Sequence, residues 1–310
     1  MQKRILVIIG DEISRFVQAT GALQDIRSHH SDTHITLLVH RSLKKMAASC
    51  PWVDDISYDA HIPLWPNPIA HFQHRQRIKY FLNQFDIVYD FQHNHESKLY
   101  MSLSSPNKWC SCHEGAGIFM HPKALKENPL VDIFRIQLSL ARVSSHHKPD
   151  ITYLADGKKD ILQFYKCQPG QYVVLIPGSR RSHIQRRWPH YLELGKLLAA
   201  QQVPMVIVGS LAEESFVTFL AQKLNIPLIF NPDWPELVTI LQNARYVVGN
   251  DTGPFYFAIA SGAQGTILYG PDSANKRRHA PKSTAITVLE HEKNLAAVSP
   301  HMVLKTIPKH

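Results

Sequence analysis

The sequence is poor in cysteine and contains no long apolar run. Only 4 of its 310 residues are cysteine, which is too few for the disulfide framework that is typical of small secreted proteins. The first apolar run ends at Ile9, before Gly10, Asp11 and Glu12, and is too short for a signal peptide or a membrane span. No later segment approaches the roughly 18 apolar residues that a membrane-spanning helix needs. We therefore expect a cytoplasmic protein, soluble or peripheral at a membrane surface.

Two common nucleotide-binding motifs are also absent. The chain has no Walker loop, and no Gly-x-Gly-x-x-Gly follows the first apolar run. These absences disfavour a P-loop kinase and a dinucleotide-dependent dehydrogenase. No recognised nucleic-acid-binding motif occurs either, so a nucleic-acid partner is not expected.

Acidic residues are outnumbered by basic ones. The chain has 34 Lys and Arg against 25 Asp and Glu, a formal net charge of +9. This balance favours an anionic partner, such as a nucleotide, an acidic glycolipid or a membrane surface. A basic soluble protein without such a partner is the alternative.

Predicted strands and helices alternate along the chain, which indicates an α/β fold with parallel sheets. In the first half, the apolar spacing predicts strands at Arg4–Ile9, Ile35–Val39, near Asp55 and at Phe85–Asp90, and helices at Phe16–Arg27, Ser42–Ala48 and Val131–Val143. In the second half, it predicts strands at Gln171–Ile176, Pro204–Val208, Pro227–Phe230, Arg245–Gly249 and Gly265–Tyr269, and helices at Pro189–Gln201, Ala212–Leu224, Trp234–Gln242 and Pro254–Ser261.

The length suits two domains of about 150 residues. The stretch "SSHHKPD" resembles a linker. We place an N-terminal domain at residues 1–155 and a C-terminal domain at residues 156–290. The remaining residues, 291–310, contain a predicted helix at Asn294–Thr306 that we expect to pack back toward the N-terminal domain.

Polar residues follow the predicted strands of the second half, at the strand ends where open α/β sheets bind ligands. After Gln171–Ile176, Gly178 permits a tight turn and Ser179 offers a hydroxyl. Four arginines follow whose guanidinium groups are suited to phosphate oxygens: Arg180, Arg181, Arg186 and Arg187. A solvated basic loop explains this cluster equally well when it is considered alone.

The next three loops add to the pattern. Glu213 follows Gly209 and is suited either to a ribose diol or to stabilising a helix N-terminus. The turn "FNPDWP" offers backbone groups to the edge of a base. The polar cluster Asn250–Thr252 then opens a helix with Pro254 in its first turn, and a helix N-terminus is suited to a diphosphate. The four loops together predict a nucleotide site.

Cys110, Cys112 and His113 form a Cys-x-Cys-His motif with no second pair downstream. This is a weak match to the spacing of structural zinc sites. We interpret the cysteines as buried or loop thiols and expect no metal site.

The chain resembles the heptosyltransferases of glycosyltransferase family 9. The resemblance depends on "PGSRR", "RRWP", "VIVGSLAEE", "ARYVVGNDTGPFYFAIASG" and "ILYGPDS", and in the first half on "ILVI", "TGALQDIR", "PWVDDI" and "FDIVYDFQHN". It implies the GT-B fold, with two Rossmann-like domains whose parallel sheets face a central cleft. It also implies an inverting, metal-independent enzyme that moves a heptose from ADP to an anionic lipopolysaccharide core at the inner membrane. The nucleotide sugar is a co-substrate, and no cofactor is expected.

The resemblance assigns donor-binding roles to residues of the second half. It places Ser179 and Arg180 in the diphosphate-binding turn, Glu213 at the ribose and Pro232–Trp234 at the base. The helix N-terminus beneath the diphosphate corresponds to Asp251, Thr252 and Gly253. Two positions depart from the family: Arg186 replaces a lysine, and Tyr256 replaces a histidine.

The position of the catalytic base departs from the family pattern. The family has a Gly-Asp pair after the first strand, whose Asp is the proposed base, and ungapped counting puts Ser14 and Arg15 there. The pair Gly10-Asp11 lies four residues earlier. Because an inverting transfer needs a base for the acceptor hydroxyl, we assign that role to Asp11, with Glu12 as the alternative. Asp11 as a simple helix cap and a base elsewhere in the first half remain open.

The displaced Asp and Tyr256 also motivate a second function. In this alternative, the chain is a catalytically silent relative of the heptosyltransferases that binds nucleotide or glycan in a regulatory or scaffold role.

Overall fold

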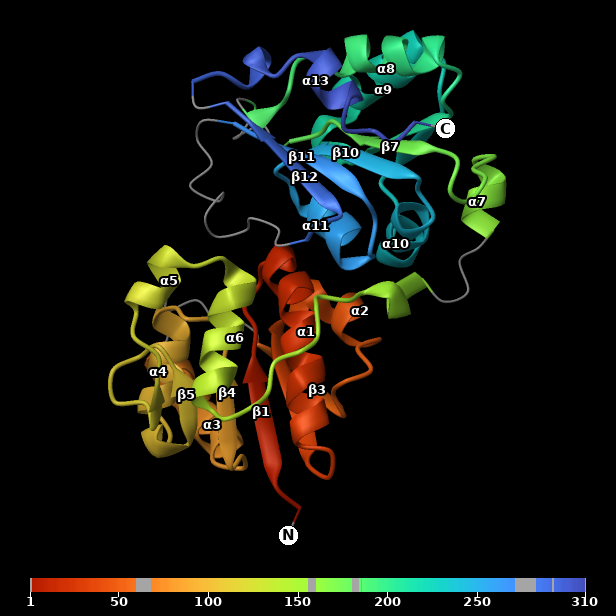
Figure 1. Cartoon of the computed structure of the whole chain (residues 1–310). Coiled ribbons are helices and arrows are strands. Elements are labelled where there is room, and N and C mark those ends of the chain that lie inside the picture. Colours follow the sequence, from red (N-terminus) through yellow and green to blue (C-terminus); the bar gives the residue numbers. More distant parts are fainter. Residues whose placement is uncertain are drawn as a thin grey trace. The chain divides into compact units, whose positions relative to one another are not determined.

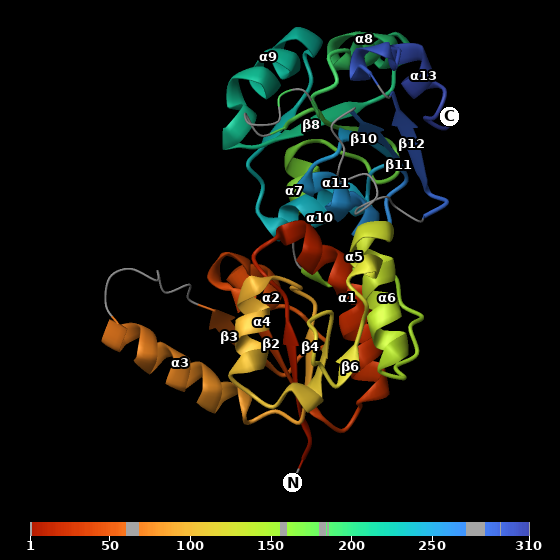
Figure 2. The same ribbon diagram turned by 90° about the vertical axis from the view of Figure 1, so that its left-hand side faces the viewer.

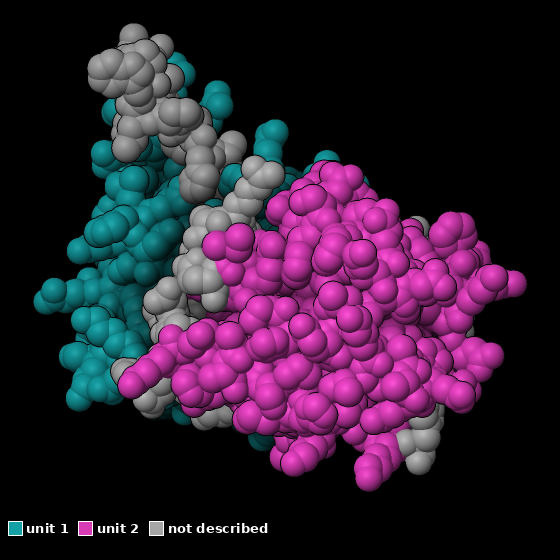
Figure 3. All heavy atoms as spheres, turned by 90° about the horizontal axis from the view of Figure 1, so that it is seen from above, with its two compact units in different colours: residues 1–149 teal, residues 150–310 magenta. Residues whose placement is uncertain are grey.

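The chain divides into two compact units, residues 1–149 and residues 150–310, which Figure 3 colours separately. The structure is a computed structural model that describes residues 2–59, 68–155, 160–179, 184, 186–270, 283–291 and 293–309, without the side chains of residues 59, 68–71 and 74. Each unit contains a six-stranded parallel sheet with helices packed on it (Figure 1). The predicted α/β fold with two Rossmann-like units is confirmed.

The sheet of the first unit has the strand order β3-β2-β1-β4-β5-β6. Every neighbouring pair is parallel. The strands are β1 (Arg4–Ile8), β2 (His34–His40), β3 (Asp55–Asp59), β4 (Ile87–Asp90), β5 (Trp109–Ser111) and β6 (Ile118–Phe119). The helices are α1 (Ile13–His29), α2 (Lys44–Ala47), α3 (Pro68–Leu82), α4 (His95–Ser102), α5 (Lys123–Glu127) and α6 (Leu130–Leu140).

The sheet of the second unit repeats this arrangement with the order β12-β11-β10-β7-β8-β9. Its strands are β7 (Val173–Ile176), β8 (Met205–Gly209), β9 (Leu228–Phe230), β10 (Tyr246–Asn250), β11 (Gly265–Tyr269) and β12 (Ile286–Glu290). Its helices are α7 (Asp160–Phe164), α8 (Tyr191–Ala200), α9 (Glu214–Leu224), α10 (Trp234–Gln242), α11 (Gly253–Ala260) and α13 (Pro300–Leu304).

The central strands form because their sequences are continuous apolar runs, which suit a parallel sheet covered on both faces. Every residue of β7, β8, β10 and β11 is buried. Capping residues in the sequence also determine where two helices start. Asp233 and Glu236 form a capping box at the start of α10, and Asn94 and Ser97 form one at α4.

The strand order fixes where ligands can bind in each unit. Successive strands are added on one side of β1 and then on the other, so the order reverses between β1 and β4, and likewise between β7 and β10. Ligands of open α/β sheets bind at the carboxyl ends of the strands beside such a switch point. The loops after β1, β4, β7 and β10 are therefore the ones that matter for function.

The C-terminal segment differs from the single helix expected at Asn294–Thr306. It forms a short 3-10 turn, Leu295–Ala297, and then α13. Pro300 lies in the first turn of α13, where its missing N–H costs no hydrogen bond. This helix packs against α8 of the second unit. A contact of the segment with the first unit stays a prediction.

Candidate functional site

Asn250 joins the carboxyl ends of β7 and β10 in the second unit. Its side chain is buried and donates to the carbonyls of Pro177 (2.9 Å) and Gly178 (3.2 Å). Its Oδ1 accepts from the Trp188 backbone N–H at 3.1 Å and the Tyr191 hydroxyl at 3.2 Å. One amide thus fixes two strand-end loops, because the Asn side chain offers two N–H donors and an oxygen that can accept twice.

Beside this junction, Ser179 and two arginines present buried polar atoms without partners. Ser179 is 3% exposed. Among the described residues, its Oγ and the Nε atoms of Arg186 and Arg187 have no hydrogen-bond partner. A buried donor without a partner costs free energy unless a ligand or water satisfies it. Three such groups at one strand end are chemically suited to a ligand rich in hydrogen-bond acceptors.

Arg187 belongs to this cluster, although the sequence assigned the site to its neighbours. Its guanidinium lies 4.2 Å from the ring centroid of Phe216 and contacts the carbonyl of Ser179 at 3.4 Å. Burial lowers the pKa of Arg187, and the charge of Glu213 opposes that effect. The predicted Arg180 lies outside the described residues.

Asp251 lies in the first turn after β10 with its side chain only 3% exposed. Its Oδ1 accepts from the Tyr256 hydroxyl at 2.6 Å, and its Oδ2 lies 3.9 Å from Arg186. The Tyr269 hydroxyl is 3.3 Å from that of Tyr256. Burial, followed by the neighbouring Tyr269, raises the pKa of Tyr256 well above its ordinary value. Tyr256 is therefore a neutral donor that holds Asp251 in place.

The N-terminus of α11 directly follows Asp251. Thr252 is the N-cap residue, and its hydroxyl makes no capping bond to a described backbone N–H. Gly253 follows, and no atom of the described chain lies within 4 Å of the position that a Cβ would take there. Within the described residues, nothing covers this helix end on the side of Gly253.

Glu213 lies against the turn that begins at Gly178. A Cβ on Gly178 would overlap the Glu213 carboxylate, so only glycine allows this approach. The other carboxylate oxygen of Glu213 accepts from the Ser210 hydroxyl at 2.9 Å. Glu213 therefore lies at the same strand ends as Ser179 and Arg187.

Trp234, which the resemblance assigns to the base, begins α10 and stacks on Phe257, with ring centroids 5.1 Å apart.

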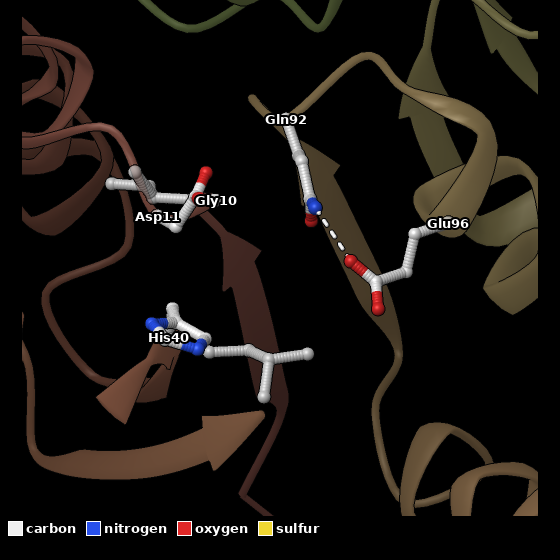
Figure 4. Close-up of a pocket in the computed structure, with 7 residues that line it drawn as sticks. Gly10, Asp11, His40, Gln92 and Glu96 are labelled. Carbon is white, nitrogen blue, oxygen red and sulfur yellow. Dashed lines mark hydrogen bonds between the residues drawn. The ribbon is translucent and has the colours of Figure 1, made fainter. Parts of the chain in front are cut away.

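In the first unit, the loops after β1, β2 and β4 enclose a small hollow (Figure 4). Polar side chains from separate elements line it: Asp11, His40, Gln92 and Glu96. Asp11 and Glu12 are exposed, between the end of β1 and the start of α1. The Gln92 amide donates to the Glu96 carboxylate at 2.9 Å. The Gln92 side chain passes 3.2 Å from the position that a Cβ on residue 10 would take, so glycine at this position leaves room for Gln92.

A buried carboxylate, Asp90, fixes the loop that carries Gln92. Its Oδ1 accepts from the backbone N–H groups of Gln92 (3.0 Å) and His93 (3.1 Å). Its Oδ2 accepts from the Ser111 hydroxyl at 2.7 Å and lies 3.3 Å from His113 Nε2. Burial alone would raise the pKa of Asp90, but the hydrogen bond from His113 and the other donors lower it to about 2. Asp90 is a stable anion that organises the loop.

Ungapped counting aligns Ser14 and Arg15 with the family's Gly-Asp pair, and neither residue is a carboxylate. Ser14 and Arg15 lie inside α1, and Arg15 is 5% exposed. Its guanidinium donates to the Phe91 carbonyl at 2.7 Å and pairs with Glu12 at 3.3 Å. Asp11 lies four positions before Arg15, which is about the length of one helical turn. Asp11 and the N-cap residue Glu12 lie directly before the start of α1, and a catalytic role for either of them stays a prediction.

Cys110 and His113 make their hydrogen bonds to different groups. Cys110 Sγ donates to the Gln137 carbonyl at 3.4 Å, and His113 contacts Asp90 and Ser97. Burial raises the pKa of Cys110 to about 12 and that of Cys112 to about 11. In the part of the chain that the structure describes, no group of three or more His, Cys, Asp or Glu residues is placed to hold a metal ion. Metal independence stays a prediction.

Within the residues that the structure describes, no helix is long and apolar enough to cross a membrane.

The sequence and the fold resemble known proteins. Residues 75–306 match the model of glycosyltransferase family 9 (heptosyltransferase). No curated protein matches the chain in sequence.

Solved structures match the whole chain. A glycosyltransferase family 9 protein from Veillonella parvula gives a TM-score of 0.79 at 15% identity, with 98% of this chain and 95% of that chain covered. The E. coli ADP-heptose lipopolysaccharide heptosyltransferase II gives 0.75 at 16% identity, covering 99% and 97%. The E. coli heptosyltransferase WaaC with ADP-2-deoxy-2-fluoro heptose gives 0.75 at 18% identity, covering 98% of each chain. At these identities the likeness establishes the fold, which is GT-B.

Proposed function

The chain belongs to glycosyltransferase family 9 (heptosyltransferase), and from that membership we propose that it transfers a heptose from ADP to a lipopolysaccharide core or a related glycan. The second unit binds the nucleotide sugar, and the first unit binds the acceptor, an anionic glycolipid at the cytoplasmic face of the inner membrane. Structures similar to this fold hold ADP and an ADP-heptose analogue. The observation that carries the proposal is the group of buried donors around Ser179 that have no partner among the described residues.

The leaving diphosphate is received at the carboxyl ends of β7 and β10. Ser179, Arg186 and Arg187 supply donors to its oxygens, with Arg180 as a further ligand from the family pattern. Backbone N–H groups at Thr252 and Gly253 add the N-terminal dipole of α11. A carboxylate repels a diphosphate, so the side chain of Asp251 serves to hold Arg186 and Tyr256. Glu213 accepts from the ribose hydroxyls.

Transfer proceeds with inversion in one displacement. Asp11, or Glu12 in its place, removes the proton from the acceptor hydroxyl as that oxygen bonds to the anomeric carbon. The bond from that carbon to the diphosphate oxygen breaks, and the electron pair leaves with the nucleoside diphosphate. The cations and helix N-terminus stabilise the developing charge without a metal.

Calorimetric titration with ADP, UDP, GDP and CDP tests the donor site. We expect one diphosphate, ADP, to bind. Ser179→Ala should weaken its binding about tenfold, which corresponds to one hydrogen bond to a charged group. Ser215, exposed on α9, provides the matched control, and Ser215→Ala should leave binding unchanged. The donor site is refuted if no diphosphate binds or if both variants bind as the wild type does.

A catalytically silent relative is the second candidate, and Arg15 favours it. A buried arginine occupies the position that ungapped counting gives to the base. In that case ADP binds, and no sugar is transferred or hydrolysed.

A further inference from the structure

Helix α3 of the first unit presents an unusual outer face. It extends along the edge of this unit, with its N-terminal part pointing away from the sheet (Figure 2). Its C-terminal turns pack inward: Ile78 and Phe81 contact the apolar cluster beneath, and Leu82 is fully buried. Phe81 also meets Phe85 edge to face, with ring centroids 5.0 Å apart. One side of the helix is therefore fixed, and the other is left to solvent.

The outer face combines aromatic rings with cations. Residues spaced three, four, seven and eight apart lie on one side of a helix, and from position 72 these are Phe72, Arg75, Gln76, Lys79 and Tyr80. All five are exposed, Phe72 by 62% and Tyr80 by 75%. Single exposed apolar residues are common on proteins. Two aromatic rings that flank two cations on one face are a more specific arrangement.

Charge on this face is of one sign. The helix sequence Pro68–Leu82 has no acidic residue, and Arg77 adds a third exposed cation next to the face. Within the described residues, Arg75, Arg77 and Lys79 take part in no ion pair. Aromatic rings partition into the interfacial region of a bilayer, while basic residues attract its anionic headgroups. The complementary partner is an anionic lipid surface.

We propose that the outer face of α3, formed by Phe72, Arg75, Gln76, Lys79 and Tyr80, docks the protein onto an anionic phospholipid membrane. The rings enter the headgroup region, and the cations pair with lipid phosphates. This docking does not depend on sugar transfer, although it brings the first unit to the surface where a glycolipid acceptor resides.

Sedimentation with vesicles tests the proposal. Wild-type protein should bind vesicles of equal parts phosphatidylglycerol and phosphatidylcholine, and should not bind phosphatidylcholine alone. The variant Arg75→Gln/Lys79→Gln should bind about thirtyfold more weakly, since each basic residue near an anionic surface contributes about a fivefold factor. The control Lys196→Gln/Lys223→Gln removes the same charge from exposed positions of the second unit and should bind as the wild type does.

A second pair of variants tests the aromatic part. Phe72→Ser should weaken vesicle binding, whereas Phe164→Ser, at a ring 76% exposed in the second unit, should not. Equal losses in the two charge variants would mean that overall charge, and not α3, drives binding. A dimer in solution that Phe72→Ser dissociates would make a second copy of the chain the occupant. Either result would overturn the proposal, as would a failure to bind anionic vesicles.

Discussion

At the scale of single residues, His93 is a half-buried imidazole held in an unusual backbone conformation. Its φ of 56° lies in the left-handed region, and its Nε2 lies 2.8 Å from Gln137 Oε1. Burial lowers the pKa of His93 to about 4, and the charge of Arg15 adds to that effect, although Asp90 opposes it. Because the unfolded chain binds the proton more readily, His93 costs stability as pH falls from about 6.5 toward 4.

The variant His93→Asn should remove this pH dependence. Asparagine tolerates the left-handed conformation, so the loop can keep its path. Between pH 7 and pH 4.5 we expect the wild type to lose about 2–3 kcal/mol of unfolding free energy that the variant does not lose. Urea unfolding at the two pH values measures it. The exposed His121→Asn is the control and should follow the wild type; a His93→Asn variant that does the same would contradict the assignment.

The sequence predicted some site residues at this scale and missed others for a physical reason. Ser179, Glu213 and Asp251 follow buried strands directly, so their place at the strand ends could be read from the order of residues. Gln92 and Glu96 belong to a polar loop after a strand, but their contact depends on the Asp90 network, which assembles from distant segments. Tyr269 ends a predicted strand, yet only the fold shows that it contacts Tyr256.

At the scale of elements, continuous apolar runs made the central strands predictable. The missed elements have weak patterns. β5 has three residues and β6 has two, which is too short for a periodicity to appear. Among the side chains of α3 that the structure describes, the buried and half-buried ones lie in the C-terminal turns, so no apolar stripe appears along the described part of the helix. Short or exposed elements are positioned by contacts with residues distant in the sequence, and the local apolar spacing carries no information about those contacts.

The packing of α13 against α8 yields a stability prediction. Val303 is 0% exposed within the core of the second unit, whereas its neighbour Met302 is 46% exposed. Val303→Ala should lower the unfolding free energy by about 2 kcal/mol, because it removes two buried methyl groups and leaves a cavity. Met302→Ala should change it by less than about 0.5 kcal/mol. Urea unfolding compares the two, and equal small effects would contradict this placement of the helix.

At the scale of the whole molecule, two units with the same strand order place two sets of polar residues at equivalent switch points. The second unit offers buried donors suited to an anion, and the first offers exposed carboxylates beside a small hollow. The parallel α/β architecture could be predicted because strands and helices alternate in both halves. The base could not, since two neighbouring carboxylates, Asp11 and Glu12, lie before α1, while the position given by ungapped counting, Arg15, lies inside the helix.

The most direct test of the account is a sugar-transfer assay with an ADP-heptose donor and a lipopolysaccharide-core acceptor. We predict that the wild type forms the glycosylated product and that Asp11→Asn lowers kcat by about 10²- to 10⁴-fold, the range for losing a general base, with unchanged ADP affinity. Asp32, exposed in the same unit, provides the control, and Asp32→Asn should transfer sugar as the wild type does. ADP binding without any product from the wild type would contradict the account and leave the silent relative as the function.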